Sequence, residues 1–264
     1  MNSPVRWVGG KSKSVKYLLD LIPSHYTYVE PFFGGGWLYF AKDKAKVEII
    51  NDANNDLMNF YNVIVNNYDE FTEKFKYLIP SRALFESYKG KIGNLNDVDR
   101  AVAFYYINRT CFSGDMQRPR MGTSNIRRSN ICVVTDDVHK FLSPIHERLK
   151  NTLVESLDYK EIFKRYDMKP TTKEQRDIFF FVDPPYKESY GYENEFTNTD
   201  HAELAKILNN LNGKFMLTIN DDEEIKEWYK DFNIITNDVM YKICRDVKGI
   251  GNRKELIITN YEIE

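Results

Sequence analysis

The stretch Phe179-Phe180-Phe181-Val182-Asp183-Pro184-Pro185-Tyr186 decides how the rest of the chain can be interpreted. Its first four residues are apolar and mostly aromatic, which predicts a short buried strand. The two prolines end this strand because proline has no N–H to donate to a neighbouring strand. Asp183 is therefore expected at the carboxyl end of the strand, where ligands bind in an open α/β sheet.

The residues at this strand end form a candidate site for a planar group that carries an amino group. The carboxylate of Asp183 and the carbonyl of Pro184 can accept the two amino hydrogens, and the ring of Tyr186 can stack on the plane. The alternative is a strand that simply ends in a proline turn, with Asp183 as a helix cap. These residues alone leave both interpretations open.

The composition indicates a folded α/β protein. The 264 residues suffice for one α/β domain with an insertion or for two small domains. A hydrophobic content of 42% with 14% aromatic residues excludes a disordered chain. No apolar run of about 18 residues predicts a membrane span, and the first residues do not resemble a signal peptide. We therefore expect a cytoplasmic protein without a membrane partner.

The cysteines and histidines are scattered without metal-ligand spacing. They are Cys111, Cys132, Cys244, His25, His139, His146 and His201. Neither a disulfide framework nor a zinc site is expected from these positions, and no metal is predicted.

A glycine cluster follows the first predicted strand. Residues 26–30 predict a strand, Gly34-Gly35-Gly36 a turn, and residues 37–41 the start of a helix. Backbone without side chains at a helix start lets a ligand approach closely. A second strand at 47–50 ends at Asp52, a position suited to the hydroxyls of a nucleoside ribose. The alternatives are a plain tight turn and a helix cap.

The middle of the chain is predicted to be helical and then basic. Helical periodicity covers residues 53–88, with Ile79 on an apolar face, and residues 98–108. Residues 109–131 then hold five arginines against one acid, Asp115. Arginine suits bidentate contacts to guanine edges and phosphates, so we favour nucleic-acid contact over a solvated loop. Further elements are expected as a helix at 138–149, a strand from 153, a helix from Thr199 or Asp200, and strands at 214–220, 232–235 and 254–260.

Six motifs occur in order along nearly the whole chain. They are Trp7-x-Gly9-Gly10-Lys11, Glu30-Pro31-Phe32-x-Gly34-Gly35-Gly36, Asn51-Asp52, Asn108-Arg109 followed by Phe112-Ser113-Gly114, Asp183-Pro184-Pro185-Tyr186, and Glu255-Leu256-Ile257-Ile258-Thr259-Asn260. Together they resemble the Dam-type DNA adenine N6-methyltransferases in the α arrangement. These enzymes use S-adenosylmethionine, and a target adenine in duplex DNA must be flipped out of the helix before methyl transfer.

The resemblance implies a fold and a division into domains. It implies an α/β fold, a Rossmann-like methyltransferase sheet with helices on both faces. Residues 1–55 and 150–264 would form the catalytic domain that binds S-adenosylmethionine. Residues 56–149 would form an inserted, mostly helical target-recognition domain with a basic hairpin that binds double-stranded DNA.

The resemblance and the arginine cluster together assign candidate roles to individual residues. Target adenine binding and catalysis are expected from Asp183, Pro184, Pro185 and Tyr186. Cofactor contacts are expected from Trp7, Lys11, Glu30, Pro31, Phe32, Gly34, Gly36, Asp52, Asp158, Tyr159 and Asp183. DNA contacts are expected from Asn108, Arg109, Ser113, Arg118, Arg120, Arg127 and Arg128. Among the arginines, Arg109 and Arg118 or Arg120 would contact base edges, and Arg127 and Arg128 would contact phosphates.

The chain departs from the family after the recognition hairpin. Residues 119–124 read Pro-Arg-Met-Gly-Thr-Ser where the family often has a Phe-Asn-Val-Pro-Phe-Gly-like turn, so the recognised DNA sequence stays open.

Alternatives to adenine methylation are an amino methyltransferase for cytosine N4, RNA or a protein amide, and a catalytically silent DNA-binding module. Cytosine enzymes usually begin the proline motif with Ser and amide enzymes with Asn. A cognate restriction endonuclease is a candidate partner, and a bacterial or phage source would fit.

Overall fold

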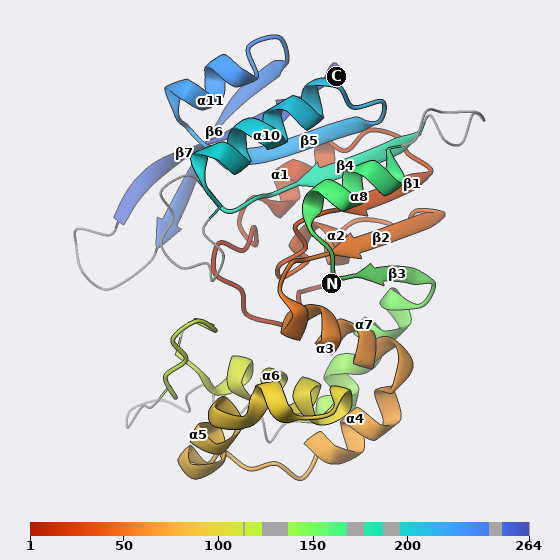
Figure 1. Cartoon of the computed structure of the whole chain (residues 1–264), viewed down its shortest axis with the longest axis vertical. Helices are drawn as coiled ribbons and strands as arrows, with labels where there is room; N and C mark the ends of the chain where they lie inside the picture. Colours follow the sequence, from red (N-terminus) through yellow and green to blue (C-terminus); the bar gives the residue numbers. More distant parts are fainter. Residues whose placement is uncertain (113, 123–136, 168–176, 187–195, 243–249, 264) are drawn as a thin grey trace. The chain divides into compact units, whose positions relative to one another are not determined.

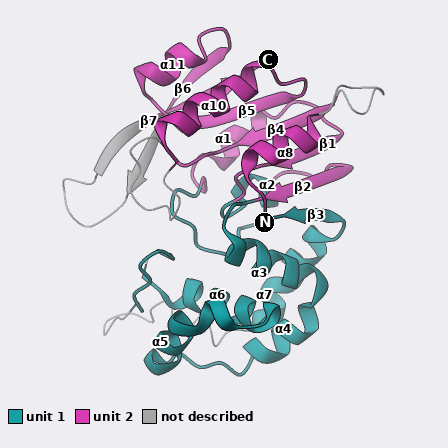
Figure 2. Cartoon of the chain, viewed as in Figure 1, with its two compact units in different colours: residues 1–10, 34–41, 52–156 teal, residues 11–33, 42–51, 157–264 magenta. Residues whose placement is uncertain are grey.

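The computed structural model describes residues 1–112, 114–122, 137–167, 177–186, 196–242 and 250–263, with side chains outside residues 238–253. The chain divides into two compact units (Figure 2). Unit 1 comprises residues 1–10, 34–41 and 52–156. Unit 2 comprises residues 11–33, 42–51 and 157–264.

Unit 2 is built around a mainly parallel sheet (Figure 1). Six of the seven strands belong to it: β1 (Thr27–Glu30), β2 (Val47–Asn51), β4 (Ile178–Val182), β5 (Lys214–Asn220), β6 (Asn233–Lys242) and β7 (Ile250–Thr259). Their order is β2-β1-β4-β5-β7-β6. β1 is parallel to β2 and β4, and β4 is parallel to β5, whereas β7 is antiparallel to β5 and β6. The strand order reverses between β1 and β4, so the predicted Rossmann-like sheet is confirmed.

Alternate residues of the strands pack on opposite faces of this sheet. On one face, Phe180 of β4 and Leu217 of β5 join a buried cluster with side chains from α8 (Tyr159–Tyr166), α10 (Asn198–Asn209) and α11 (Glu223–Trp228). On the other face, Phe179 packs against Tyr28 and Tyr261. Figure 1 shows α1 (Val15–Asp20) on that side, opposite α8 and α10. Both faces of the β4 strand are therefore buried, which explains its unbroken apolar sequence.

Two helices of unit 2 were absent from the sequence-based prediction, and one begins earlier than expected. The short helices α8 and α11 were not predicted. Thr197, rather than Thr199 or Asp200, caps α10: its hydroxyl accepts a hydrogen bond from the Asp200 N–H, and the Asp200 carboxylate accepts one from the Thr197 N–H. This reciprocal pattern is a capping box. The sequence therefore identified the region in which this helix begins, but it placed the N-cap two to three residues too late.

Unit 1 is mostly helical. Its elements are α2 (Trp37–Ala41), α3 (Asn55–Asn66), α4 (Tyr68–Phe75), α5 (Arg82–Lys91), the 3₁₀ helix η1 (Ile92–Asn94), α6 (Asp97–Thr110), α7 (Val138–Leu149) and β3 (Thr152–Glu155). α6 is buried along most of its length, and its Tyr105 stacks on Phe60 of α3 with ring centroids 5.0 Å apart. The expectation that Ile79 lies on the apolar face of a helix was wrong. Ile79 is 67% exposed and lies in the connection between α4 and α5.

The structure draws the boundaries between the parts differently from the sequence. Residues 52–149 of unit 1 include the proposed recognition domain, but residues 1–10 and 34–41 also cluster with it. The division into domains at residues 55 and 150 therefore stays a prediction. No helix of the described residues is long and apolar enough to cross a membrane.

Candidate active site

In unit 2, the Asp183 carboxylate is held through one of its two oxygens. The buried ammonium of Lys11 lies 2.7 Å from Asp183 Oδ1, and the hydroxyl of Thr218 donates a 2.8 Å hydrogen bond to the same oxygen. Thr218 belongs to β5, the strand beside β4. Neighbouring strands and the N-terminal segment thus fix this carboxylate at the carboxyl edge of the sheet.

The second oxygen of Asp183 is available to a ligand. Within the described part of the chain, Oδ2 accepts no hydrogen bond, and 20% of the side chain stays exposed. The interpretation of Asp183 as a helix cap is not what the described residues show, because its partners are the side chains of Lys11 and Thr218. A carboxylate oxygen that has no partner among the described residues, on a side chain fixed through its other oxygen, is suited to accept a hydrogen from an amino group.

Tyr186 is joined to the same cluster through its hydroxyl. Lys11 donates a 2.6 Å hydrogen bond to this hydroxyl, and the ammonium lies 4.5 Å from the centre of the tyrosine ring. The hydroxyl in turn donates to Glu255 of β7, whose side chain is 1% exposed. Glu255 is the first residue of one of the six sequence motifs, but no function was predicted for it. An acid that opens the buried apolar run of residues 256–258 was the signal that could have identified it.

The ionisation of Asp183 reflects this surrounding. Burial raises the pKa of Asp183, the Lys11 ammonium lowers it, and the neighbouring Glu255 carboxylate raises it. The charged side chains of Lys11, Asp183 and Glu255 sum to one negative charge, so this cluster favours a cation beside it.

Glu30 at the end of β1 is a second buried carboxylate near Asp183. Burial raises its pKa well above the ordinary value, a hydrogen bond from the Tyr28 hydroxyl lowers the pKa, and the charge of Asp183 raises it. The Tyr28 hydroxyl lies 2.7 Å from Glu30 Oε2. The structure therefore places these two predicted site residues at the adjoining ends of β1 and β4, where the strand order reverses.

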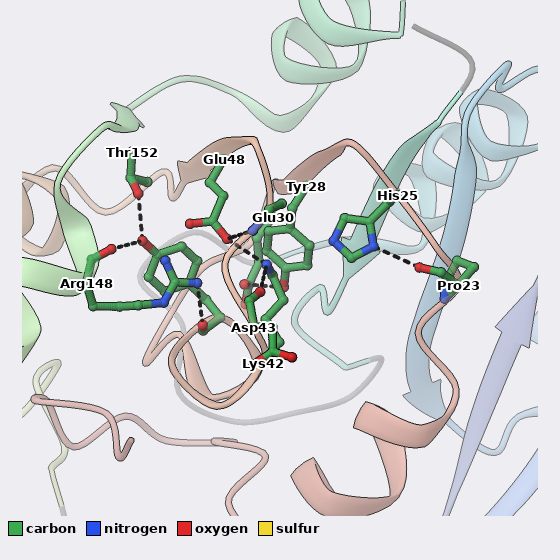
Figure 3. Close-up of polar contacts among 11 residues, drawn as sticks. Pro23, His25, Tyr28, Glu30, Lys42, Asp43, Glu48, Arg148 and Thr152 are labelled. Atoms are coloured by element: carbon green, nitrogen blue, oxygen red, sulfur yellow. Dashed lines mark hydrogen bonds and ion pairs between the residues drawn. The ribbon is translucent and has the colours of Figure 1, made fainter. Parts of the chain in front are cut away.

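A second buried lysine, Lys42, lies over the ring of Tyr28 (Figure 3). The ammonium of Lys42 is 2.6 Å from Glu48 Oε1 and 4.2 Å from the centre of the Tyr28 ring. Both charged side chains of this pair are almost completely buried. Neither residue was singled out from the sequence.

Other predicted cofactor residues of unit 2 are brought together by Asn51. Its side-chain amide donates to the carbonyls of Pro31 and Leu157 and accepts from the Leu157 N–H. Phe32 and Tyr159, which flank these contacts in the sequence, lie 5.2 Å apart between ring centroids. The carboxylate of Asp158 is exposed and caps α8 by accepting the Lys160 N–H. Asn51 was quoted in a motif, but its structural contribution was not predicted.

In unit 1, the glycine turn is tied to Asp52. The Gly34 N–H donates to Asp52 Oδ2 at 2.8 Å, and the Asn54 N–H donates to Oδ1 at 2.9 Å. Gly34 has a φ of 47°, and a Cβ there would come 2.8 Å from Trp7 Cδ1, so a side chain is excluded. Asn54 rather than Asp52 caps α3. The structure thus brings together Trp7, Gly34 and Asp52, and Gly36 also has a positive φ of 62°.

Asn108, which was expected to contact DNA, is buried in the structure, and its DNA contact stays a prediction. Asn108 has no exposed surface, and its amide bonds the backbone N–H and carbonyl of Arg6. It therefore holds the N-terminal segment of unit 1. The next residue, Arg109, donates to the Pro4 carbonyl and lies over the rings of Tyr105 and Phe141. Its proposed contact with a base edge stays a prediction.

The start of the basic stretch forms a short antiparallel connection after α6. Cys111 pairs with Met121, and the Phe112 N–H donates to the Arg120 carbonyl. Arg118 and Arg120 are exposed, and Phe112 is 66% exposed, which is unusual for a large apolar side chain. Phe112 was not predicted as a site residue. The predicted contacts of Ser113, Arg127 and Arg128 lie outside the described residues.

No group of three or more His, Cys, Asp or Glu side chains that could hold a metal ion occurs in the described part of the chain. The sheet order, with Asp183 at its carboxyl edge, defines a Rossmann-like α/β protein. Residues 7–243 match the model of the D12 class N6 adenine-specific DNA methyltransferases, and the chain belongs to this family. The resemblance found in the sequence is thereby confirmed, and the chain is an S-adenosylmethionine-dependent, adenine-specific DNA methyltransferase.

Relatives of similar length carry matching names. Type II methyltransferase M.CviBI of Paramecium bursaria Chlorella virus NC1A is 26% identical, over 99% of this chain and 100% of that protein. Type II methyltransferase M1.LlaDCHI of Lactococcus lactis subsp. cremoris is 27% identical, over 97% and 94%. The DNA adenine methylase of Salmonella typhi is 26% identical, over 96% and 91%.

Proposed function

We propose that Asp183, Pro184, Pro185 and Tyr186 hold the target adenine of double-stranded DNA after it has been flipped out of the helix. The observation that supports this proposal is that the two oxygens of the Asp183 carboxylate have different surroundings. Lys11 and Thr218 hold Oδ1, whereas Oδ2 accepts no hydrogen bond from the described residues, and the side chain is 20% exposed. In this proposal, Oδ2 and the Pro184 carbonyl accept the two hydrogens of the adenine N6 amine.

These contacts would activate a poor nucleophile. The lone pair of the N6 amine is delocalised into the ring, and hydrogen bonds to its two hydrogens localise that pair on nitrogen and fix its direction. S-adenosylmethionine supplies the methyl group from its sulfonium. Nitrogen becomes cationic when it gains the methyl group, and the net negative charge of Lys11, Asp183 and Glu255 stabilises that cation until a proton leaves. Stacking on Tyr186 would offset part of the unstacking cost by about 1–3 kcal/mol.

The residues proposed for the cofactor fit its chemistry. The excess carboxylate in unit 2 suits a sulfonium cation, and Gly34 leaves no room for a side chain beside Trp7 in unit 1. We propose that Lys11, Glu30, Pro31, Phe32, Asp158, Tyr159 and Asp183 provide the cofactor contacts of unit 2. Trp7, Gly34, Gly36 and Asp52 of unit 1 remain the cofactor contacts that the resemblance implies.

The test of the proposed site is a pair of substitutions at Asp183. Asp183→Asn keeps an oxygen for Lys11 and Thr218 but removes the charge, and we expect single-turnover methyl transfer to fall by about 100- to 1,000-fold. Asp183→Ala should abolish transfer. In the parent enzyme, the rate should fall as the pH drops through a pKa above the ordinary aspartate value, because protonation removes the acceptor. A parent-like rate in Asp183→Ala, at unchanged folding, contradicts the assignment.

We further propose that Arg109 and either Arg118 or Arg120, both of which are exposed, contact base edges, and that Arg127 and Arg128 contact phosphates. Alanine substitution of a base contact should relax specificity at one position by about 1–3 kcal/mol. Loss of a phosphate contact should weaken binding to all sequences and lower the salt dependence by about one unit. Methylation profiles over all single-base variants of the preferred site, with salt titrations, distinguish the two roles. The opposite pattern would exchange the assignments.

A cytoplasmic site of action and a cognate restriction endonuclease are proposals of a different kind. The first follows from the DNA substrate. The second is suggested by the two relatives that are called Type II methyltransferases. Sequencing of methylated adenines in cells that express the protein would identify the recognition site, which is needed to test for a cognate endonuclease.

A further inference from the structure

Glu255 is a buried carboxylate beside the proposed site, and the chemistry described so far does not require it to touch the substrate. Its side chain is 1% exposed. Its Oε1 lies 3.2 Å from the Lys11 ammonium and accepts the hydrogen of the Tyr186 hydroxyl. Its Oε2 is buried and has no hydrogen-bond partner among the described residues. Such an unsatisfied group in a native protein calls for a physical reason.

The strand topology explains how a residue so late in the chain reaches this place. β7 is antiparallel to β5, with Glu255 opposite Asn220 and Ile257 opposite Thr218. The early residues of β7 therefore lie beside the carboxyl end of β5. Three adjacent strands, β4, β5 and β7, thus supply Asp183 just beyond β4, Thr218 and Glu255 to one edge of the sheet.

Folding alone gives no reason for a second carboxylate at this edge. Burial of a charge is costly unless partners compensate it, and here one lysine faces two carboxylates. The charge of Glu255 also raises the pKa of Asp183. The residues that follow, Leu256 to Ile258, are buried and apolar, so the strand could continue its apolar pattern without an acid. The cost suggests a role in the reaction.

We propose that Glu255 is a positioning residue for methyl transfer, which fixes the ring of Tyr186 and the ammonium of Lys11 through a single carboxylate oxygen. This inference rests on the proposed roles of Asp183 and Tyr186.

The contacts show how positioning would work. The Tyr186 hydroxyl accepts a hydrogen bond from Lys11 and donates one to Glu255, so it is held from two sides. A hydrogen bond to a charged acceptor is stronger than one between neutral groups. Lys11 has oxygen atoms of Asp183, Tyr186 and Glu255 within 3.2 Å, which match the three N–H groups of an ammonium. Without Glu255, both the tyrosine ring and the lysine lose one of their restraints.

The experiment compares Glu255→Ala, Glu255→Gln and Tyr186→Phe in the full-length enzyme, with Glu48→Gln as a matched control. Glu48 is also 1% exposed and pairs with a buried lysine in unit 2, but no catalytic contact is assigned to it. Substrates are duplexes with the preferred site, identified from methylated genomic DNA. We expect Glu255→Ala to slow single-turnover methyl transfer by about 100-fold, because a misplacement of about 1 Å can have that effect. Glu255→Gln retains an oxygen for the tyrosine hydroxyl and should recover part of this loss.

A double-mutant cycle separates positioning through Tyr186 from an independent effect. If Glu255 acts partly through the tyrosine hydroxyl, Glu255→Ala should cause a clearly smaller fold-loss in the Tyr186→Phe background than in the parent. Equal fold-losses in both backgrounds overturn positioning through Tyr186. If Glu255→Ala does not fold, the cycle is made with Glu255→Gln, for which the same comparison decides.

A second measurement reports on the base instead of the reaction. Duplexes with 2-aminopurine at the target position fluoresce when the base leaves the helix, and stacking on a tyrosine quenches that signal. We expect bound 2-aminopurine to be brighter with Glu255→Ala than with the parent, and unchanged with Glu48→Gln. A parent-like signal and rate for Glu255→Ala, together with an inactive Asp183→Ala, overturn the role of Glu255 and leave the proposed function intact. An active Asp183→Ala contradicts the proposed function itself.

Discussion

Among the described residues of unit 2, Lys11 and Lys42 are both buried, but their surroundings differ in one essential respect. Lys42 forms an ion pair with Glu48 and donates to the Asp43 carbonyl, and the charged side chains of Lys42 and Glu48 are 3% and 1% exposed (Figure 3). Lys11 faces two carboxylates, and one of them, Asp183, is 20% exposed. The first cluster is neutral and complete. The second carries an excess negative charge and leaves one acceptor oxygen uncommitted.

This difference separates a structural ion pair from a reactive site. A neutral, fully paired group offers nothing to a ligand, and its loss is felt as instability. A cluster with excess charge and an open acceptor is less stable on its own, and a ligand with N–H groups or positive charge completes it. We therefore expect substitutions in the two clusters to affect different measured quantities.

The largest contrast is expected between Lys11→Met and Lys42→Met. Lys11→Met leaves Asp183 and Glu255 without their cation, so that Oδ1 keeps only the hydrogen bond from Thr218, and methyl transfer should fall by more than about 1,000-fold. Lys42→Met leaves Glu48 uncompensated, and the free energy of unfolding should fall by about 3–5 kcal/mol. Single-turnover rates and denaturant unfolding of both variants provide the measurement. If Lys42→Met also lost activity while folded, the two clusters would not be functionally distinct.

The same contrast shows what the sequence could and could not predict. The strand before Asp183, the glycine turn and the order of motifs were apparent because each depends on local pattern. The partners of Asp183 were not, because Lys11, Thr218 and Glu255 come from distant parts of the chain and meet only through the strand order. The burial of Asn108 was not predicted for a related reason, because its two hydrogen bonds to the distant Arg6 form only in the folded chain. The Lys42 and Glu48 pair carries no motif and was not detected.

Glu30 provides a prediction of intermediate size, because it links stability to pH. Its pKa is raised by burial, so the folded protein binds a proton more tightly than the unfolded chain does. The ionised form therefore destabilises the fold at pH values above the raised pKa, and this penalty disappears as the pH falls toward the ordinary range of glutamate.

The test is Glu30→Gln, which removes the ionisable group at nearly constant shape. We expect this variant to be more stable than the parent at pH 7, by on the order of 1 kcal/mol. The advantage should vanish in unfolding experiments at pH values near the ordinary glutamate pKa. Calorimetry should show weaker binding of S-adenosylmethionine at the same time. A variant less stable than the parent at pH 7 would show that Glu30 is compensated by a partner other than those described.

The smallest expected effect concerns Tyr28, which contacts both Lys42 and the proposed cofactor residue Glu30. Its ring faces the Lys42 ammonium, and its hydroxyl donates to Glu30, a proposed cofactor residue (Figure 3). Tyr28→Phe keeps the ring for Lys42 but removes the hydrogen bond that lowers the pKa of Glu30. That pKa should rise further, and cofactor binding should weaken by about 0.5–1.5 kcal/mol, the usual contribution of one hydrogen bond. Calorimetric titration with S-adenosylmethionine across a pH series measures the shift, with Glu48→Gln as the control that alters Lys42 but leaves the Tyr28 hydroxyl in place. If Glu48→Gln weakened cofactor binding as much as Tyr28→Phe did, the charges of Lys42 and Glu48, which also act on the pKa of Glu30, would control the site, and the description of this pair as purely structural would have to be given up.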